Sequence, residues 1–197
     1  MKSDILKLGS EIGLLANILA ETEKAAAYCG LDAKQTGRLR LLAEELCEML
    51  PELLSFSTGE FWVESEGKNF ELHTTLVPKE ALSLELREKL LDISSSGKNA
   101  AAVGIIAKIR IAAEFLLIDY SKASEDEPIL PSFFYDGKIG QTYFESAWSL
   151  KEYRKKTNEI KGEKWDELER SIIANIADEV LVGIQGSKVE VIVKKTF

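Results

Sequence analysis

A short polar run is the strongest anion-binding candidate in the chain. Ser94-Ser95-Ser96-Gly97-Lys98-Asn99 stands directly before a long apolar segment that we expect to be helical. Free backbone N–H groups at a helix start point towards a ligand, and a lysine there adds positive charge. We therefore predict a phosphate site at Ser96, Gly97, Lys98 and Asn99. The run lacks the Gly-x-x-x-x-Gly-Lys-Ser/Thr spacing of a P-loop, and its composition also suits an ordinary loop.

Residues that could ligate a metal or act as nucleophiles are few. The single histidine, His73, falls on the more polar face of an expected strand, and we interpret it as a surface residue without a catalytic role. The two cysteines, Cys29 and Cys47, lie inside helical patterns and form no Cys-x-x-Cys pair. We therefore expect reduced core thiols and no zinc site.

The composition indicates a globular protein with one domain and an insertion. The chain has 197 residues, 45% of them hydrophobic, and a net charge of −8. Nucleic acids and anionic membranes need a basic surface, so the acidic balance disfavours both and leaves a basic protein partner open. The residues after Met1 do not resemble a signal peptide, and the most apolar stretch, Ala100–Ile118, contains three charged residues. We expect a cytoplasmic protein without a membrane span.

Two helices are expected before residue 55. Apolar residues recur at helical spacing over Ser3–Tyr28, and Gly30 suits a C-terminal cap. Asp32 and Gln35 have the spacing of a capping box before the next helix, Arg38–Leu54. An apolar stripe marks the buried side of that helix. Three glutamates off the stripe are typical of a solvated face: Glu44, Glu45 and Glu48.

A β-hairpin is expected to follow these helices. Phe61–Glu64 and Asn69–Val77 alternate as strands do, after a turn segment at Ser55–Glu60. The end of the chain repeats this order, since helical spacing up to Ile176 gives way to two further strands, Glu179–Ile184 and Lys188–Val193. The sequence therefore predicts an α+β fold. It is a two-layer α/β sandwich with a mostly antiparallel sheet and helices on one face.

The middle of the chain is expected to enlarge this sandwich with a helical and aromatic-rich insertion. The aromatic residues gather between Phe133 and Trp148. They could fill a small satellite core, form a protein-binding surface or line a pocket for a small ligand. The single domain, 1–197, is divided into N-terminal helices and first hairpin (1–77), a lid-like region or insertion (78–164), and a final helix and closing hairpin (165–197).

With its elements in this order, the chain resembles the GHKL superfamily, whose bacterial branch includes histidine-kinase ATPase domains and serine-kinase-like anti-sigma factors. Arg40–Leu46 is similar to the anti-sigma helix that contains Leu-Ala-x-Glu-Glu-Ala and precedes a β-hairpin. Ile172–Val180 is similar to the family's last helix, which runs into a Met-Asp-Glu-Val segment and a second hairpin. The resemblance implies a histidine-kinase-like ATPase fold.

The nucleotide motifs of this family are altered in the chain. The first motif places an Asn four residues after a Glu to hold magnesium; if Glu45 is that Glu, the Asn position is Met49, which we expect in the core. The second motif, Asp-x-Gly-x-Gly, is replaced by Thr74-Thr75-Leu76-Val77-Pro78. Of the residues that define the first two motifs, the chain therefore has only the Glu, as Glu45.

The third motif of the family, Gly-x-Gly, lets the backbone approach the phosphates. Its positions fall on Glu167 and Glu169, whose negative charge would repel phosphate. An alternative alignment places this motif at Gly97 and Gly104, with the apolar helix as the phosphate-binding helix.

Two functions follow from the resemblance. The first is a cytoplasmic regulatory or protein-interaction module, a pseudoenzyme without a cofactor that binds a protein partner and can form a homodimer. The second is an ATP-binding protein or serine/threonine-protein kinase of the anti-sigma type, which uses ATP and magnesium. In the second, Glu45 is the general base or magnesium organiser, and Ser96, Gly97, Lys98 and Asn99 hold the phosphates.

Overall fold

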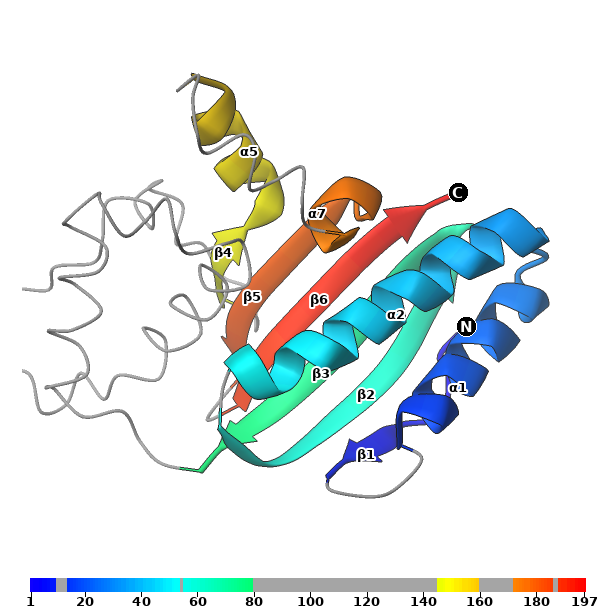
Figure 1. The fold of residues 1–197 in the computed structure, drawn as a ribbon, viewed down its shortest axis with the longest axis horizontal. Helices are drawn as coiled ribbons and strands as arrows, with labels where there is room; N and C mark the ends of the chain where they lie inside the picture. The colour runs from blue at the N-terminus through cyan, green and yellow to red at the C-terminus, as the bar shows by residue number, and fades with distance from the viewer. Residues whose placement is uncertain (10–13, 54, 80–144, 160–171, 186–187) are drawn as a thin grey trace, which may run out of the picture.

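The described residues form an α+β fold around a six-stranded sheet (Figure 1). The structure is a computed structural model that describes residues 1–9, 14–53, 55–79, 145–159, 172–185 and 188–197. Its helices are α1 (Leu14–Tyr28), α2 (Ala33–Leu53), α5 (Leu150–Glu159) and α7 (Ile172–Ile176). Its strands are β1 (Leu6–Leu8), β2 (Phe56–Glu66), β3 (Asn69–Pro78), β4 (Glu145–Ser149), β5 (Glu179–Gln185) and β6 (Lys188–Thr196).

The sheet joins the two ends of the chain. Its strand order is β1-β2-β3-β6-β5-β4, and every neighbouring pair is antiparallel. The hairpins β2–β3 and β5–β6 were both predicted. They meet where β3 pairs with β6, with His73 opposite Ile192. The junction between the two hairpins therefore lies in the middle of the sheet.

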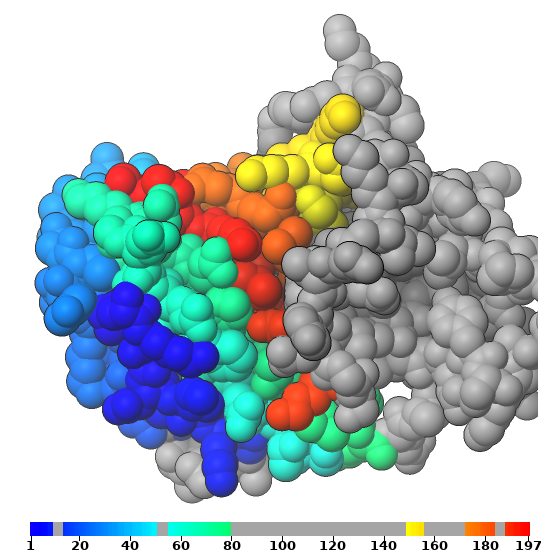
Figure 2. Space-filling model, turned by 180° about the vertical axis from the view of Figure 1, so that it is seen from behind, coloured from blue at the N-terminus to red at the C-terminus, as the bar shows by residue number. Residues whose placement is uncertain are grey.

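Helices α1 and α2 cover one face of the sheet (Figure 1). From behind, β2, β3 and β6 reach the surface, and the N-terminal residues, in dark blue, lie along β2 (Figure 2). The predicted two-layer sandwich, with a mostly antiparallel sheet and helices on one face, is confirmed. Apart from β4, α5 and residues 78–79, the predicted insertion lies outside the described residues.

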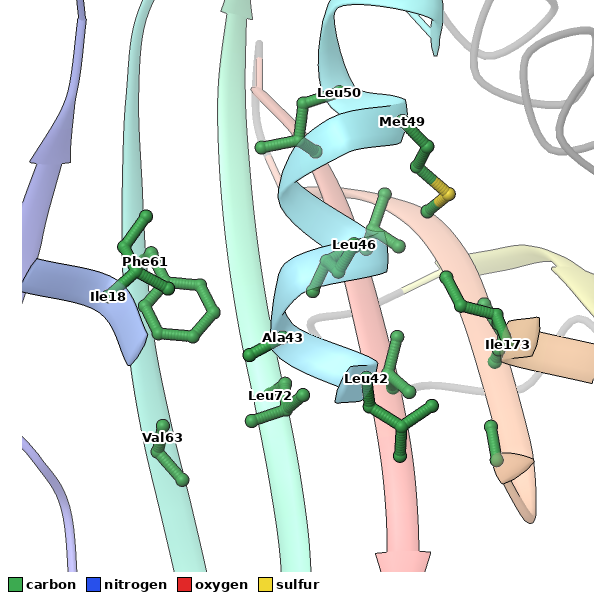
Figure 3. Packing of buried hydrophobic residues seen from close by; sticks show 14 of the residues in the cluster. Ile18, Leu42, Ala43, Leu46, Met49, Leu50, Phe61, Val63, Leu72 and Ile173 are labelled. Atoms are coloured by element: carbon green, nitrogen blue, oxygen red, sulfur yellow. The ribbon is translucent and has the colours of Figure 1, made fainter. Parts of the chain in front are cut away.

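The hydrophobic core lies between the sheet and α2. Alternate residues of the central strands, among them Phe61 and Leu72, point towards the helices, because successive side chains of a strand face opposite sides. The predicted apolar stripe of α2 packs against them (Figure 3). Its buried members are Leu39, Leu42, Leu46, Met49 and Leu50. Each large side chain buried in this way contributes about 1.5–3 kcal/mol relative to exposure.

Two predicted helix-end signals are confirmed. Asp32 and Gln35 form the capping box of α2. The backbone N–H of Gln35 donates to Asp32 Oδ1 at 2.8 Å, and the backbone N–H of Asp32 donates to Gln35 Oε1 at 3.1 Å. Gly30 follows the C-terminus of α1 with a φ of 66°, a left-handed conformation that favours glycine.

The prediction of a helix beginning at Ser3 was wrong for its first residues. Leu6–Leu8 forms β1, and the described helix α1 begins at Leu14. The backbone N–H of Ser3 also donates to the carbonyl of Val63 at 2.8 Å, so the N-terminal residues run along β2. The backbone groups at this edge of β2 need partners, and that requirement outweighs the helical spacing of the local apolar residues.

Strand β2 is longer than predicted. Ser55–Glu60 was expected to form a turn, but β2 begins at Phe56 and pairs with β3 along its length. A register irregularity between Phe56 and Thr58 accommodates the turn-forming residues of this stretch. Pairing with β3 therefore outweighs the local turn signals of Ser55–Glu60 and makes residues from Phe56 onward part of β2. The turn of this hairpin lies beyond Glu66, where Gly67 has a φ of 59°.

Candidate functional site

Many residues that the sequence singles out lie outside the described residues. They include the predicted phosphate site, the alternative glycine and the two positions of the third motif: Ser96, Gly97, Lys98, Asn99, Gly104, Glu167 and Glu169. The aromatic segment from Phe133 to Trp148 is described only from residue 145, where Trp148 pairs with Val182 of β5. These predictions remain predictions.

Glu45, the candidate catalytic residue, lies on α2 and is partly buried. Burial is the main cause that raises the pKa of Glu45, and the negative charges of Glu48 and Glu44 raise it further. No basic residue among those that the structure describes pairs with it. A carboxyl with a raised pKa, next to two further acids, takes up a proton more readily than an ordinary surface glutamate.

Met49 occupies the position one turn after Glu45 and belongs to the core. Its side chain is 2% exposed and packs among the buried residues between α2, α7 and the sheet (Figure 3). The expectation that Met49 is a core residue is confirmed. A thioether in an apolar core is not a ligand for magnesium, which prefers oxygen. Within the described ranges, no group of three or more His, Cys, Asp or Glu side chains is placed to hold a metal ion.

The residues that replace the family's second motif are part of the sheet. The run Thr74-Thr75-Leu76-Val77-Pro78 forms the end of β3, where Thr74 and Leu76 are fully buried. The hydroxyl of Thr74 has no hydrogen-bond partner among the described residues. This part of the chain therefore fills the core and presents no acidic group there for an adenine amino group.

Asp178 and Glu179, in the segment similar to the family's Met-Asp-Glu-Val, bind backbone groups. Asp178 Oδ2 accepts a hydrogen bond of 2.7 Å from the backbone N–H of Thr196, and Lys195 Nζ donates to Asp178 Oδ1 at 2.8 Å. Glu179 Oε1 accepts a bond of 3.0 Å from the backbone N–H of Lys151. Both carboxylates therefore have structural partners that tie β5 to β6 and to α5.

A second contact in this region ties the middle of α5 to the C-terminal end of α7. The guanidinium of Arg154, on α5, donates to the carbonyl of Ala174 and, at 3.2 Å, to the carbonyl of Ala177. These carbonyls lie at the C-terminal end of α7, where a cation also interacts favourably with the helix dipole. Arg154 belongs to a locally basic run of the sequence, 151–156, but the spacing of that run gives no indication of its partners on α7.

A polar cluster on the other face of the sheet was not predicted. His73, at the centre of β3, stacks on Trp62 of β2 with ring centroids 4.8 Å apart and planes 9° from parallel. Its Nδ1 lies 3.0 Å from Glu190 Oε1 on β6, within hydrogen-bond distance, and its Nε2 lies 3.2 Å from Glu71 Oε2. The interpretation of His73 as a surface residue was wrong, since it is only 8% exposed.

Two lysines complete the polar cluster. Lys194 Nζ contacts Glu71 Oε1 at 2.8 Å. Lys2 Nζ lies 2.9 Å from Glu64 Oε1 and 4.6 Å from the centre of the Trp62 ring. The hydrogen bond from Lys2 is the main cause that lowers the pKa of Glu64; burial opposes it, and the indole N–H of Trp62 adds to it. The alternation of β3 put His73 and Glu71 on the polar face, but the other two neighbours of the ring, Trp62 and Glu190, come from β2 and β6.

Comparison of the chain with protein-family models, with curated proteins and with solved structures finds no match. Among the residues that the structure describes, no helix has the length and apolar character needed to cross a membrane.

Proposed function

We propose that this chain is a cytoplasmic regulatory module with a GHKL-like sandwich, which binds a protein partner and does not carry out ordinary ATP hydrolysis or kinase chemistry. The observation that carries the proposal is the position of Met49. It follows Glu45 by one helical turn, where the family that the sequence resembles has its magnesium-binding Asn, and it is buried in the core. A magnesium site at this place on α2 would need a different residue.

The arrangement of elements also supports the proposal. Helix α2 leads into the hairpin β2–β3, and α7 leads into the hairpin β5–β6. The two hairpins join through β3 and β6, and α7 packs against α2. This is the helix-and-hairpin order on which the resemblance rests. The order of elements therefore supports the resemblance, and the apolar residue Met49 stands at the position where that family has its magnesium ligand.

Isothermal titration of the full chain with ATP and magnesium tests the proposal. We expect no saturable heat up to millimolar ATP, for the chain and for its Lys98→Ala variant alike. Micromolar affinity that requires magnesium would contradict the proposal. Because Lys98 is the only lysine of the predicted phosphate run, its loss identifies where any bound phosphate would lie.

The partner is tested by affinity capture of the tagged chain from its native cells, followed by quantitative mass spectrometry and reconstitution with the purified candidate. We expect a stoichiometric complex whose affinity is the same with and without ATP. A complex that forms only with ATP and magnesium would contradict a cofactor-free module. The untagged chain, analysed by light scattering, shows whether a homodimer forms instead.

The second candidate is an ATP-binding protein or serine/threonine kinase with an altered site. The raised pKa of Glu45 favours it, because general bases often have carboxyl groups whose proton affinity is increased by burial and neighbouring acids. If this candidate is right, Lys98→Ala abolishes ATP binding, and Glu45→Gln abolishes phosphoryl transfer while affinity persists. Unchanged affinity in Lys98→Ala would count against it.

A further inference from the structure

The outward side of α2 carries a stripe of residues that recur at intervals of three and four positions. The buried stripe of this helix faces the sheet, and α2 lies beside α1, so the opposite side of α2 faces away from the sheet (Figure 1). We call the residues on that side the outer stripe of α2: Lys34, Gly37, Arg38, Leu41, Glu44 and Glu48. Leu41, the only large apolar member, is partly exposed, and a Cβ at Gly37 would have nothing within 4 Å. A second helix could therefore approach here.

The charges of the outer stripe are separated along the helix. Its N-terminal half carries Lys34 and Arg38, and its C-terminal half carries Glu44 and Glu48. The members of each pair stand four positions apart, where like charges on a helix repel one another. The order of the charges is also opposite to the one that the helix dipole favours, since α2 has no acidic residue in its first turn and no basic residue in its last turn. The arrangement therefore costs stability in the isolated chain.

The rest of the described chain does not neutralise these four charges. No ion pair or side-chain hydrogen bond joins any of them to another described residue, whereas Arg40, on the side of α2 that faces α1, pairs with Glu23 at 2.8 Å. The repulsion among the acids also affects Glu45, whose pKa is raised first by burial and then by the charges of Glu48 and Glu44. A molecule that fits the outer stripe must therefore present acids to one end and bases to the other.

We propose that the outer stripe of α2 binds the same stripe of a second copy of this chain, with the two α2 helices antiparallel across a twofold axis at Leu41. Arg38 precedes Leu41 by three positions and Glu44 follows it by three, so the axis places Arg38 of each copy opposite Glu44 of the other. Lys34 and Glu48, seven positions before and after Leu41, are matched in the same way. All four charges of each stripe then have a partner of opposite sign, and the two Leu41 side chains cover each other.

This dimer is transient and sensitive to salt. One helix from each copy forms a small interface, below the roughly 1,200 Å² of stable complexes, and exposed ion pairs are individually weak. We therefore expect monomers and dimers in exchange at high protein concentration and low salt. Monomers alone should remain at about 1 M salt, where the Debye length is about 3 Å. The inference rests on the charges of α2 and not on the proposed function, because neither ATP nor another protein takes part.

Sedimentation equilibrium of the full chain at low and high salt tests the proposal, together with two charge-reversal variants. In a homodimer, Arg38→Glu places acids opposite each other and Glu44→Arg places bases opposite each other. Each variant alone should therefore associate at least about tenfold more weakly than the unmodified chain. Mixed in equal amounts, the two variants should form a heterodimer, because every charge of the outer stripe then faces one of opposite sign.

Lys7→Glu is the control for these variants. It makes the same change of charge as Arg38→Glu at an exposed side chain of β1, and it should leave the association unchanged. Circular dichroism establishes that each variant is folded. The proposal is overturned if the chain stays monomeric at every protein concentration in low salt, or if the dimer survives both single reversals. A mixture of the two variants that does not regain association would also overturn it.

Discussion

The Glu179 carboxylate, at the start of β5, accepts a hydrogen bond of 3.0 Å from the backbone N–H of Lys151, in the first turn of α5. The hydroxyl of Ser149 donates to the same Oε1 atom at 3.2 Å. At the N-terminus of a helix the first N–H groups have no partner within the helix, and a negative charge there is favourable. Glu179, although distant in sequence, thus caps the N-terminus of α5 and fixes this helix to the start of β5.

Loss of this carboxylate should release α5. Glu179→Ala leaves the Lys151 N–H without its partner, so we expect a loss of about 1–3 kcal/mol in the free energy of unfolding. Hydrogen exchange of the α5 amides should increase selectively, as measured by mass spectrometry. Glu179→Gln keeps an acceptor oxygen and should lose less. An unchanged exchange pattern in the alanine variant would show that α5 is held by its packing alone.

Two glycines should respond in opposite directions to the same substitution. A Cβ added at Gly59, in β2, would lie 2.7 Å from the carbonyl oxygen of Thr75 and 2.9 Å from a methyl of Leu76. Gly37, in the exposed part of α2, has nothing within 4 Å of that position. We expect Gly59→Ala to destabilise the chain by about 1–3 kcal/mol through overpacking, and Gly37→Ala to stabilise it by about 1 kcal/mol through helix propensity.

Urea denaturation monitored by circular dichroism measures both glycine variants. Both substitutions replace glycine by alanine, so the effect of the added methyl group on the unfolded chain is similar in the two variants. Their difference in stability therefore reports the folded-state environments of Gly59 and Gly37. If Gly59→Ala left the urea midpoint unchanged, the close approach of β2 to β3 would not hold in solution.

Local signals in the sequence were sufficient for the elements that depend on near neighbours. The capping box of Asp32 and Gln35 and the apolar stripe of α2 were predicted because each needs residues only a few positions apart. Strand β1 was missed because its partner, β2, follows some fifty residues later, and the local apolar spacing also fits a helix. Tertiary pairing therefore decided the conformation of a segment whose local signal was ambiguous.

The polar cluster around His73 could likewise not be predicted, because its residues are distant from one another in the sequence. Strand alternation placed His73 on the polar face correctly. Its burial, however, depends on Trp62 from the preceding strand and on Glu190, which is 117 residues away. A lone histidine next to a glutamate in a strand has no distinctive spacing, so the sequence alone favoured an exposed residue. Only the pairing of β3 with β6 brings the second carboxylate to the ring.

The thiol of Cys47 should react slowly with alkylating reagents. Both cysteines are free and partly buried. Burial, with a further contribution from the charge of Glu48, raises the pKa of Cys47 to about 12, so at pH 8 its thiolate fraction is about one in ten thousand. We expect iodoacetamide to modify Cys47 about a thousandfold more slowly than a free cysteine. Peptide mapping of a Cys29→Ser variant, folded and in urea, measures this; equal rates in the two states would contradict it.

Asp178 should make the stability of the chain sensitive to acid. Burial alone would raise the pKa of Asp178, but hydrogen bonds from Lys195 and from the backbone N–H of Thr196 outweigh it, so the pKa lies below its ordinary value of 3.8. The charged form is therefore favoured by folding. Its contribution is complete above pH 3.8 and is lost as the pH falls through the lower pKa of the folded state.

The Asp178→Asn variant tests this dependence. Because Asp178 is partly exposed, we expect the substitution to cost only about 1 kcal/mol at neutral pH, and the difference from the unmodified chain to vanish in strong acid. Urea denaturation at a series of pH values provides the measurement. Asp4→Asn, a change of the same charge at an exposed side chain, is the control and should show no such convergence. A constant difference between Asp178→Asn and the unmodified chain at all pH values would mean that the hydrogen bonds are insensitive to the charge of Asp178, and that the tie between β5 and β6 depends on geometry alone.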